Sequence, residues 1–143
     1  MKAQNEQNSM SGSIVRLVNL KKSFGTKEVL REINLNLLEG ENLVVLGKSG
    51  SGKSVLVKLI VGLLTADGGE INVLGKEVTK LKGDELNELR QHIGFLFQSG
   101  ALYDSMSVRQ NLEFPLVRIR KKLTADERNE KIIEVLKNVG LSD

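Results

Sequence analysis

Eight consecutive residues carry the clearest chemistry in the sequence: Gly-Lys-Ser-Gly-Ser-Gly-Lys-Ser at positions 47–54. They match the nucleotide-binding pattern G-x-x-x-x-G-K-[ST] without interruption. The glycines let the backbone curl so that successive N–H groups point inward, and these dipoles can cradle a polyphosphate. Lys53 can reach the β- and γ-phosphates, and the Ser54 hydroxyl can ligate Mg²⁺. The pattern therefore predicts a binding site for a nucleoside triphosphate.

The backbone of this loop is expected to form the phosphate cradle. Its members are Gly47, Ser49, Gly50, Ser51 and Gly52. An apolar run at 42–46 leads into the loop, and a helix-compatible apolar run at 55–60 leads out of it. Strand, glycine-rich turn and helix are the setting in which this motif binds phosphate. The alternative, a flexible glycine–serine turn, rarely carries Lys-Ser at this offset between two apolar runs.

Composition narrows the classes of function. The 143 residues suit a single domain with its own core, and 40% hydrophobic with 27% charged residues is a globular balance. The sequence has no Cys and a single His, His92, which excludes disulfides, thiolate metal sites and a histidine metal cluster. Aromatic residues make up 3%, which argues against a nucleic-acid partner bound by base stacking.

Charge and hydropathy indicate a soluble, cytosolic protein. No apolar run reaches membrane-spanning length, and the N-terminus has no signal-peptide core. The net charge is +3, and the basic residues are spread out except at 118–122. We interpret that run as a solvated segment between helices, with a patch for nucleic acid or anionic lipid as the alternative.

Hydrophobic periodicity predicts the other elements. Residues 1–12 are polar and lack periodicity, so a disordered tail is expected there. Alternating residues predict strands, and a short apolar run that ends at Gln98 predicts a buried parallel strand. The expected strands cover residues 13–20, 33–37, 42–46, 70–75 and 93–97, and a helix is expected over 84–90.

Two capping boxes predict the last helices. Ser107 with Gln110 opens one, and Pro115 should end or kink it. Thr124 with Glu127 opens the other. Strands that alternate with helices around a phosphate loop indicate an α/β fold, with a parallel core sheet and a preceding antiparallel β segment.

With these features the sequence resembles the ATP-binding-cassette (ABC) transporter ATPases over residues 13–143. The resemblance implies a P-loop NTPase fold of the ABC type, with ATP and Mg²⁺ as ligands. Phe24 stands where that family places an aromatic residue that stacks on adenine. A buried structural phenylalanine is the alternative at this position.

Gln98 matches the family's glutamine loop. In that family the glutamine closes an apolar strand, approaches Mg²⁺ and the attacking water, and moves with the docked membrane subunit. An amide suits this role because it accepts from water and ligates a cation without a fixed charge. A surface glutamine at the end of a strand is the alternative. By resemblance, Lys53 and Gln98 are the residues expected to take part in catalysis.

Residues 98–108 are similar to the subgroup that powers phospholipid and organic-solvent-resistance transport, associated with mammalian-cell-entry proteins. Residues 99–112 would line the groove that accepts the coupling helix of a membrane permease. The resemblance further implies a second ATP-binding subunit, with a homodimer favoured. It also implies a cytoplasmic location, peripheral on the inner face of the cell membrane.

The departures from the family are also informative. Family members hydrolyse ATP with a Leu-Ser-Gly-Gly-Gln-type signature, an apolar strand that ends in Asp-Glu, and a switch histidine. None of these occurs in the sequence. The two Asp-Glu pairs, at 84–85 and 126–127, follow no run of four apolar residues. The single histidine, His92, precedes Gln98, whereas the family's switch histidine lies downstream of it. We therefore expect the N-terminal portion of a longer subunit, which leaves the strands at 42–46 and 93–97 with unpaired edges.

The expected function follows from these comparisons of motifs. The full-length protein would be an ATPase subunit of an ABC transporter, whereas this chain would bind ATP·Mg without turning it over. Two alternatives stay open. One is a P-loop enzyme of another class, such as a kinase or GTPase; the other is a non-hydrolysing nucleotide-binding fragment.

Overall fold

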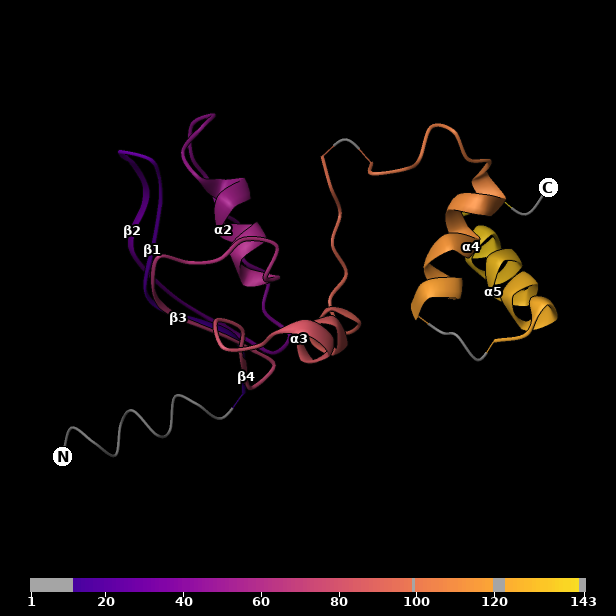
Figure 1. Cartoon of the computed structure of the whole chain (residues 1–143), viewed down its shortest axis with the longest axis horizontal. Helices are drawn as coiled ribbons and strands as arrows, with labels where there is room; N and C mark the ends of the chain where they lie inside the picture. The colour runs from indigo at the N-terminus through magenta and orange to yellow at the C-terminus, as the bar shows by residue number, and fades with distance from the viewer. Residues whose placement is uncertain (1–11, 99, 120–122, 142–143) are drawn as a thin grey trace. The chain divides into compact units, whose positions relative to one another are not determined.

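The computed structural model describes residues 12–98, 100–119 and 123–141. The chain divides into two compact units, residues 1–94 and residues 95–143 (Figure 1). Except for Gly12, the predicted polar tail lies outside the described residues.

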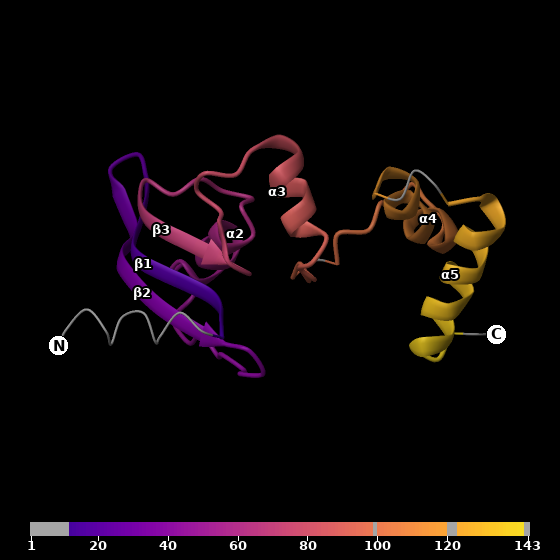
Figure 2. The same cartoon turned by 90° about the horizontal axis from the view of Figure 1, so that it is seen from below.

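The first unit is built on a four-stranded antiparallel sheet (Figures 1 and 2). Its strands are β1 (Ser13–Phe24), β2 (Lys27–Leu38), β3 (Gly68–Val73) and β4 (Lys76–Glu77), in the order β2-β1-β3-β4. The hairpin of β1 and β2 and the later strand β3 all pair antiparallel. The N-terminal antiparallel segment expected from the sequence is therefore confirmed.

An irregularity in β1 changes which side chains enter the core. Leu17 and Leu20 are both buried, although strict alternation would place them on opposite faces. The register shifts between them, and Asn19 adopts a left-handed φ of 47°. A bulge of this kind inserts a residue and reverses the alternation beyond it. A Cβ at Gly69 would lie 2.4 Å from the Asn19 carbonyl oxygen, so β3 can approach the bulge only with glycine there.

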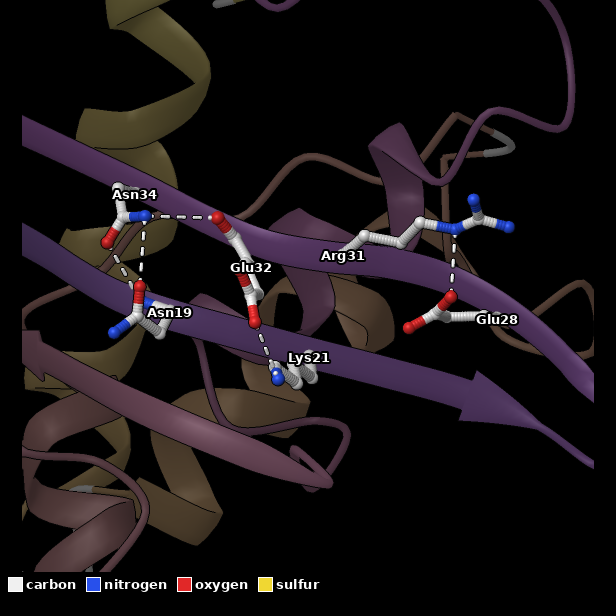
Figure 3. A network of polar contacts seen from close by, with 6 residues as sticks. All are labelled: Asn19, Lys21, Glu28, Arg31, Glu32 and Asn34. Carbon is white, nitrogen blue, oxygen red and sulfur yellow. Dashed lines mark hydrogen bonds and ion pairs between the residues drawn. The ribbon is translucent and has the colours of Figure 1, made fainter.

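Polar contacts connect the two long strands at this bulge (Figure 3). The Asn19 N–H donates to Asn34 Oδ1 at 2.9 Å, and Asn34 Nδ2 donates back to Asn19 Oδ1 at 3.2 Å. Asn34 Nδ2 also donates to the Glu32 carbonyl at 3.0 Å, and the Glu32 carboxylate pairs with Lys21 at 2.8 Å. These contacts satisfy backbone groups that the interrupted ladder leaves free.

Two helices complete the core of the first unit. They are α2 (Lys53–Ile60) and α3 (Gly83–Arg90). The buried cluster joins residues of the sheet to Leu56 and Leu59 of α2 and to Leu89 of α3. Its remaining members are Leu17, Leu20, Leu30, Ile71, Val73 and Val78. Arg90 at the end of α3 donates to the carbonyls of Val61 (3.1 Å) and Gly62 (2.6 Å), which follow α2 directly.

Two runs expected to be parallel strands do not pair. Residues 41–48 form no strand, and Val44 and Leu46 are 75% and 87% exposed. Residues 93–97 form none either, and Leu96 is 91% exposed. The prediction of a buried strand at 93–97 is therefore wrong for this chain. An apolar run becomes a strand only when its N–H and C=O groups pair with a neighbour, and no described strand pairs with either run.

The second unit contains two helices, α4 (Val108–Ile119) and α5 (Ala125–Asn138). Arg128 Nε of α5 lies 3.0 Å from Glu113 Oε1 of α4. Apolar side chains that include Leu112, Leu116 and Ile132 line a cavity of about 390 Å³. In the parts of the chain that the structure describes, no helix has the length and apolarity needed to cross a membrane.

Both predicted capping boxes are present. Ser107 N–H donates to Gln110 Oε1 at 2.8 Å and Gln110 N–H to Ser107 Oγ at 3.3 Å, at the start of α4. Thr124 and Glu127 make the same two bonds at the start of α5, at 2.7 and 3.3 Å. Pro115 was expected to end or kink the first helix; it does not end it, because α4 continues to position 119, and a kink stays a prediction. Pro115 lines the cavity together with residues of α5.

Candidate nucleotide-binding site

The loop at 47–52 is closed by the side chain of Lys53. Lys53 Nζ donates to the carbonyl oxygens of Gly47 (2.7 Å) and Lys48 (2.9 Å). The Ser51 N–H donates to the Lys48 carbonyl at 3.2 Å, which tightens the same turn. An ammonium has three N–H donors, and these bonds use two of them. The geometry therefore holds a positive charge at the loop and keeps a donor for an anion.

The backbone favours glycine at Gly52, and Gly47 is closely approached by a side chain of the same loop. Gly52 has a φ of 98°, and a Cβ there would lie 2.9 Å from Val29 Cγ1 and 3.0 Å from Leu30 Cδ2. The loop thus closes directly on β2. A Cβ at Gly47 would lie 2.6 Å from Ser51 Oγ, inside the turn itself. A side chain at Gly52 would therefore need a shift of the loop or of β2, whereas one at Gly47 would displace the Ser51 hydroxyl.

The start of α2 is open to an anion. The Leu56 N–H donates to the Gly52 carbonyl at 2.8 Å, which sets the helix start at Lys53. No side chain caps this end, and the first turn has no acidic residue. The free N–H groups and the helix dipole favour negative charge at such an end. The exposed Ser54 lies in this first turn, so the phosphate and metal residues predicted from the motif share one short segment.

The other residues predicted for the phosphate cradle lie next to one another, directly before α2. Ser49, Gly50 and Ser51 are exposed in the turn that precedes α2. Among the residues that the structure describes, no three acidic or histidine side chains gather into a metal site.

Phe24 closes β1 at the β1–β2 hairpin, where it pairs with Lys27. Its side chain is 48% exposed and is not part of the core cluster. Lys22 Nζ lies 5.3 Å from the centre of the ring, within the range of a cation–π contact. The ring therefore has area available for stacking, as an adenine-binding residue needs.

Lys22 and Asp67 form a pair near this ring that the sequence did not predict. Lys22 Nζ lies 2.6 Å from Asp67 Oδ1, and the Ser23 N–H donates to Asp67 Oδ2 at 2.6 Å. The Lys22 ammonium and the Ser23 N–H hold the pKa of the Asp67 carboxyl below its usual range. No spacing signal could have shown this pair, because the pairing of β1 with β3 brings the two residues together.

Gln98 belongs to the second unit, where it is exposed in a turn. It is therefore not among the residues that the first unit brings together, and its role at Mg²⁺ stays a prediction. The groove expected at 99–112 begins at Ser99, which lies outside the described residues. From 100 onward the segment exposes apolar side chains, including Leu102 and Tyr103.

Comparison with known proteins shows the family to which the chain belongs. The family model described as ABC transporter matches residues 30–143. This match includes the phosphate loop, α2 and Gln98. The chain therefore belongs to the ABC transporter family.

Curated relatives match nearly the whole chain. Methionine import ATP-binding protein MetN of Rhizobium johnstonii is 40% identical over 96% of this chain and 37% of its own length. The chloroplastic protein TRIGALACTOSYLDIACYLGLYCEROL 3 of Arabidopsis thaliana is 42% identical over 84% of this chain and 34% of its own. The probable ribonucleotide transport ATP-binding protein mkl of Mycobacterium leprae is 38% identical over 91% and 37%. The chain thus spans little more than a third of these relatives.

A solved structure shares the fold. The ATP-binding cassette MJ0796, described as a dimer in a post-hydrolysis state bound to ADP and Pi, has a TM-score of 0.76 and 34% identity. The match covers 86% of this chain and 56% of that one. The predicted α/β class of the ABC ATPase type is confirmed, although the runs at 42–46 and 93–97 are unpaired here.

Proposed function

We propose that this chain is the ATP-binding part of an ABC transporter ATPase subunit. The observation that carries the proposal is the Lys53 ammonium, held 2.7 Å from the Gly47 carbonyl beside an uncapped helix start. A fixed positive charge, inward-facing N–H groups and a helix N-terminus are the elements that bind a polyphosphate. The similar cassette MJ0796 is described as bound to ADP and Pi, which supports a nucleotide ligand.

The described residues fit ATP·Mg²⁺. Gly52, with its positive φ and its close approach to Val29 and Leu30, keeps the loop against β2. Lys53 would neutralise charge on the β- and γ-phosphates, and Ser54 would ligate Mg²⁺. Phe24 would stack on the base with its exposed ring. Mg²⁺ would neutralise phosphate charge, and by the family motif Gln98 would be a further residue at this metal.

Hydrolysis is proposed for the full-length protein alone. The sequence contains no signature of the Leu-Ser-Gly-Gly-Gln type and no apolar strand that ends in Asp-Glu. A carboxylate that orients water and the metal is part of phosphoryl transfer in P-loop enzymes. This chain would therefore bind ATP·Mg²⁺ without turnover.

Titration calorimetry tests the proposed nucleotide binding, and a phosphate-release assay tests the proposed absence of hydrolysis in this chain. The chain is expected to bind ATP with Mg²⁺, to bind it about 10- to 150-fold more weakly on Lys53→Ala, and to release no phosphate at saturating ATP. A marked preference for GTP over ATP would favour another class of P-loop enzyme, such as a GTPase. No heat from folded chain with ATP and Mg²⁺ would refute the proposal, and turnover that Lys53→Ala abolishes would refute its non-hydrolysing part.

The proposed partners follow from the family. ABC ATPases work as pairs with membrane permeases, and the MJ0796 cassette is described as dimeric. We expect a second ATP-binding subunit and a permease whose coupling helix contacts residues 99–112, among which Leu102 and Tyr103 are exposed. This arrangement would place the protein at the cytoplasmic face of a membrane.

A lipid-like substrate remains a proposal based on residues 98–108. The names of the relatives point in different directions: MetN is named for methionine import and mkl for ribonucleotide transport. Of the three relatives, the Arabidopsis protein, named after a galactolipid, is in keeping with a lipid. The test is ATPase stimulation of the full-length subunit with its permease by phospholipid, methionine or a ribonucleotide. Stimulation by methionine or the ribonucleotide alone would refute the lipid substrate.

A further inference from the structure

Asp67 is held against the end of β1 by three hydrogen bonds. Its own N–H donates to the Lys21 carbonyl at 3.0 Å. Its carboxylate accepts from the Ser23 N–H at 2.6 Å through Oδ2 and from Lys22 Nζ at 2.6 Å through Oδ1. The next residue along β1 is Phe24. Asp67 thus fixes both the backbone and a side chain immediately before the ring proposed to stack on adenine.

Lys22 extends this connection to the ring itself. Its side chain is only 14% exposed, whereas Asp67 is 45% exposed, so the lysine is the more enclosed member of the pair. Its ammonium binds Asp67 and also lies 5.3 Å from the centre of the Phe24 ring. A cation at this distance is attracted by the π-electrons and limits the orientations of the ring. The carboxylate therefore acts on Phe24 through the lysine as well as through the backbone.

We propose that Asp67 and Lys22 are positioning residues for base recognition, which hold the Phe24 ring in the orientation that stacks on adenine. The inference rests on the proposed function, because it assigns the means by which the same site binds its base. An exposed side chain loses rotational freedom when it is immobilised on binding, and this loss weakens affinity. A ring that is already fixed loses less. Neither residue contacts the phosphate loop through any of these bonds.

The test compares ATP with inorganic tripolyphosphate, both with Mg²⁺, by calorimetry on the whole chain. Asp67→Asn retains an oxygen that can accept from the Ser23 N–H and removes the charge that binds Lys22. Lys22→Met removes the ammonium and keeps the apolar stem. Each variant is expected to weaken ATP about 3- to 10-fold, the effect of leaving one side chain to be ordered on binding. Affinity for tripolyphosphate should stay within about 2-fold, because it has no base.

Two further measurements show whether the effect is specific to the Phe24 ring: a control substitution at another ion pair, and the same substitution in a chain that lacks the ring. Lys76 and Glu88 form an exposed ion pair of 2.9 Å between β4 and α3, and Lys76→Met should change neither affinity. In a Phe24→Ala background, Asp67→Asn should cause no further loss of ATP affinity, because the residue through which it acts is gone.

Two results would overturn the inference. Equal weakening of ATP and tripolyphosphate would show a general structural effect, and an additive loss in the Phe24→Ala background would show that Asp67 acts without the ring. If folded parent chain bound neither ligand, the proposed function would fail, and the inference with it. Thermal unfolding followed by circular dichroism shows whether each variant is folded. If Asp67→Asn is unfolded, Lys22→Met decides by the same comparison.

Discussion

Lys53 Nζ lies 2.7 Å from the carbonyl oxygen of Gly47, the first residue of the phosphate loop. This bond places the ammonium at the turn that directly precedes helix α2, of which Lys53 is the first residue. Because the charge is already positioned, little side-chain freedom remains to be lost when an anion binds. The relationship also makes Lys53 part of the loop's structure as well as of its proposed chemistry.

Replacing Lys53 by alanine should weaken ATP binding by about 10- to 150-fold, the value of a lost charged hydrogen bond of about 1.5–3 kcal/mol. Calorimetry with Mg²⁺ measures the change. Lys58→Ala is the control, since it removes a charge from the last turn of the same helix. Equal effects of the two substitutions would mean that net charge, and not the position of Lys53, sets affinity.

Gly52→Ala should destabilise the chain more than Gly50→Ala. Both glycines have positive φ, but a Cβ at Gly52 would meet Val29 and Leu30 of β2, whereas a Cβ at Gly50 meets nothing within 4 Å. We expect about 1 kcal/mol for the backbone strain alone and about 2–4 kcal/mol where overpacking adds to it. Thermal unfolding measures the difference, and similar losses would contradict the close contact of the loop with β2.

The capping box of α5 should make stability depend on pH. The Thr124 N–H and hydroxyl hold the pKa of Glu127 below its usual range. A lowered pKa means that the folded chain favours the carboxylate. The contribution is therefore present above the ordinary glutamate pKa of about 4.3 and is lost as pH falls through the lower folded value.

Thermal unfolding between about pH 6 and pH 3 tests this dependence. Glu127→Gln should reduce the fall of the unfolding midpoint on acidification. Gln110→Glu offers the complementary control, because it introduces a titrating group at the equivalent position of the Ser107 box. If acid sensitivity were unchanged in both variants, neither capping box would contribute to the pH dependence of stability.

Arg90 should be required for the packing of α3 near the end of α2. Its guanidinium donates to the carbonyls of Val61 and Gly62, at 3.1 and 2.6 Å. Arg90→Met should lower the unfolding free energy by about 2–4 kcal/mol, because two partly buried carbonyls lose a charged donor. Arg31→Met, on an exposed ion pair with Glu28, should cost less than about 0.5 kcal/mol. Denaturant unfolding compares the two, and equal losses would contradict a structural role for Arg90.

Local patterns predicted most of the elements correctly. The alternation of β2 and both capping boxes are confirmed, because each depends on residues close together in the sequence. The phosphate loop is predictable for the same reason: glycine positions and Lys53 lie within eight residues. The ends of the strands differ from the predicted ones by a few residues. The strand predicted over 70–75, for example, is β3 and covers Gly68–Val73.

The errors concern relationships between distant residues. The burial of both Leu17 and Leu20 depends on a bulge that Gly69 of another strand makes possible. The runs at 42–46 and 93–97 have the composition of strands, but pairing requires a neighbour that composition does not show. The Lys22–Asp67 pair was missed because antiparallel pairing, and not spacing, brings it together.

The unpaired run at 42–46 enters the phosphate loop directly, so its state affects the loop. Any strand that paired with Val44 and Leu46 would restrict the chain just before Gly47. If nucleotide binding orders the loop and thereby strengthens this pairing, thermodynamic reciprocity requires that the pairing strengthens nucleotide binding by the same factor. Occupancy of the loop by ATP and completion of the sheet would in that case be two measures of a single coupled equilibrium.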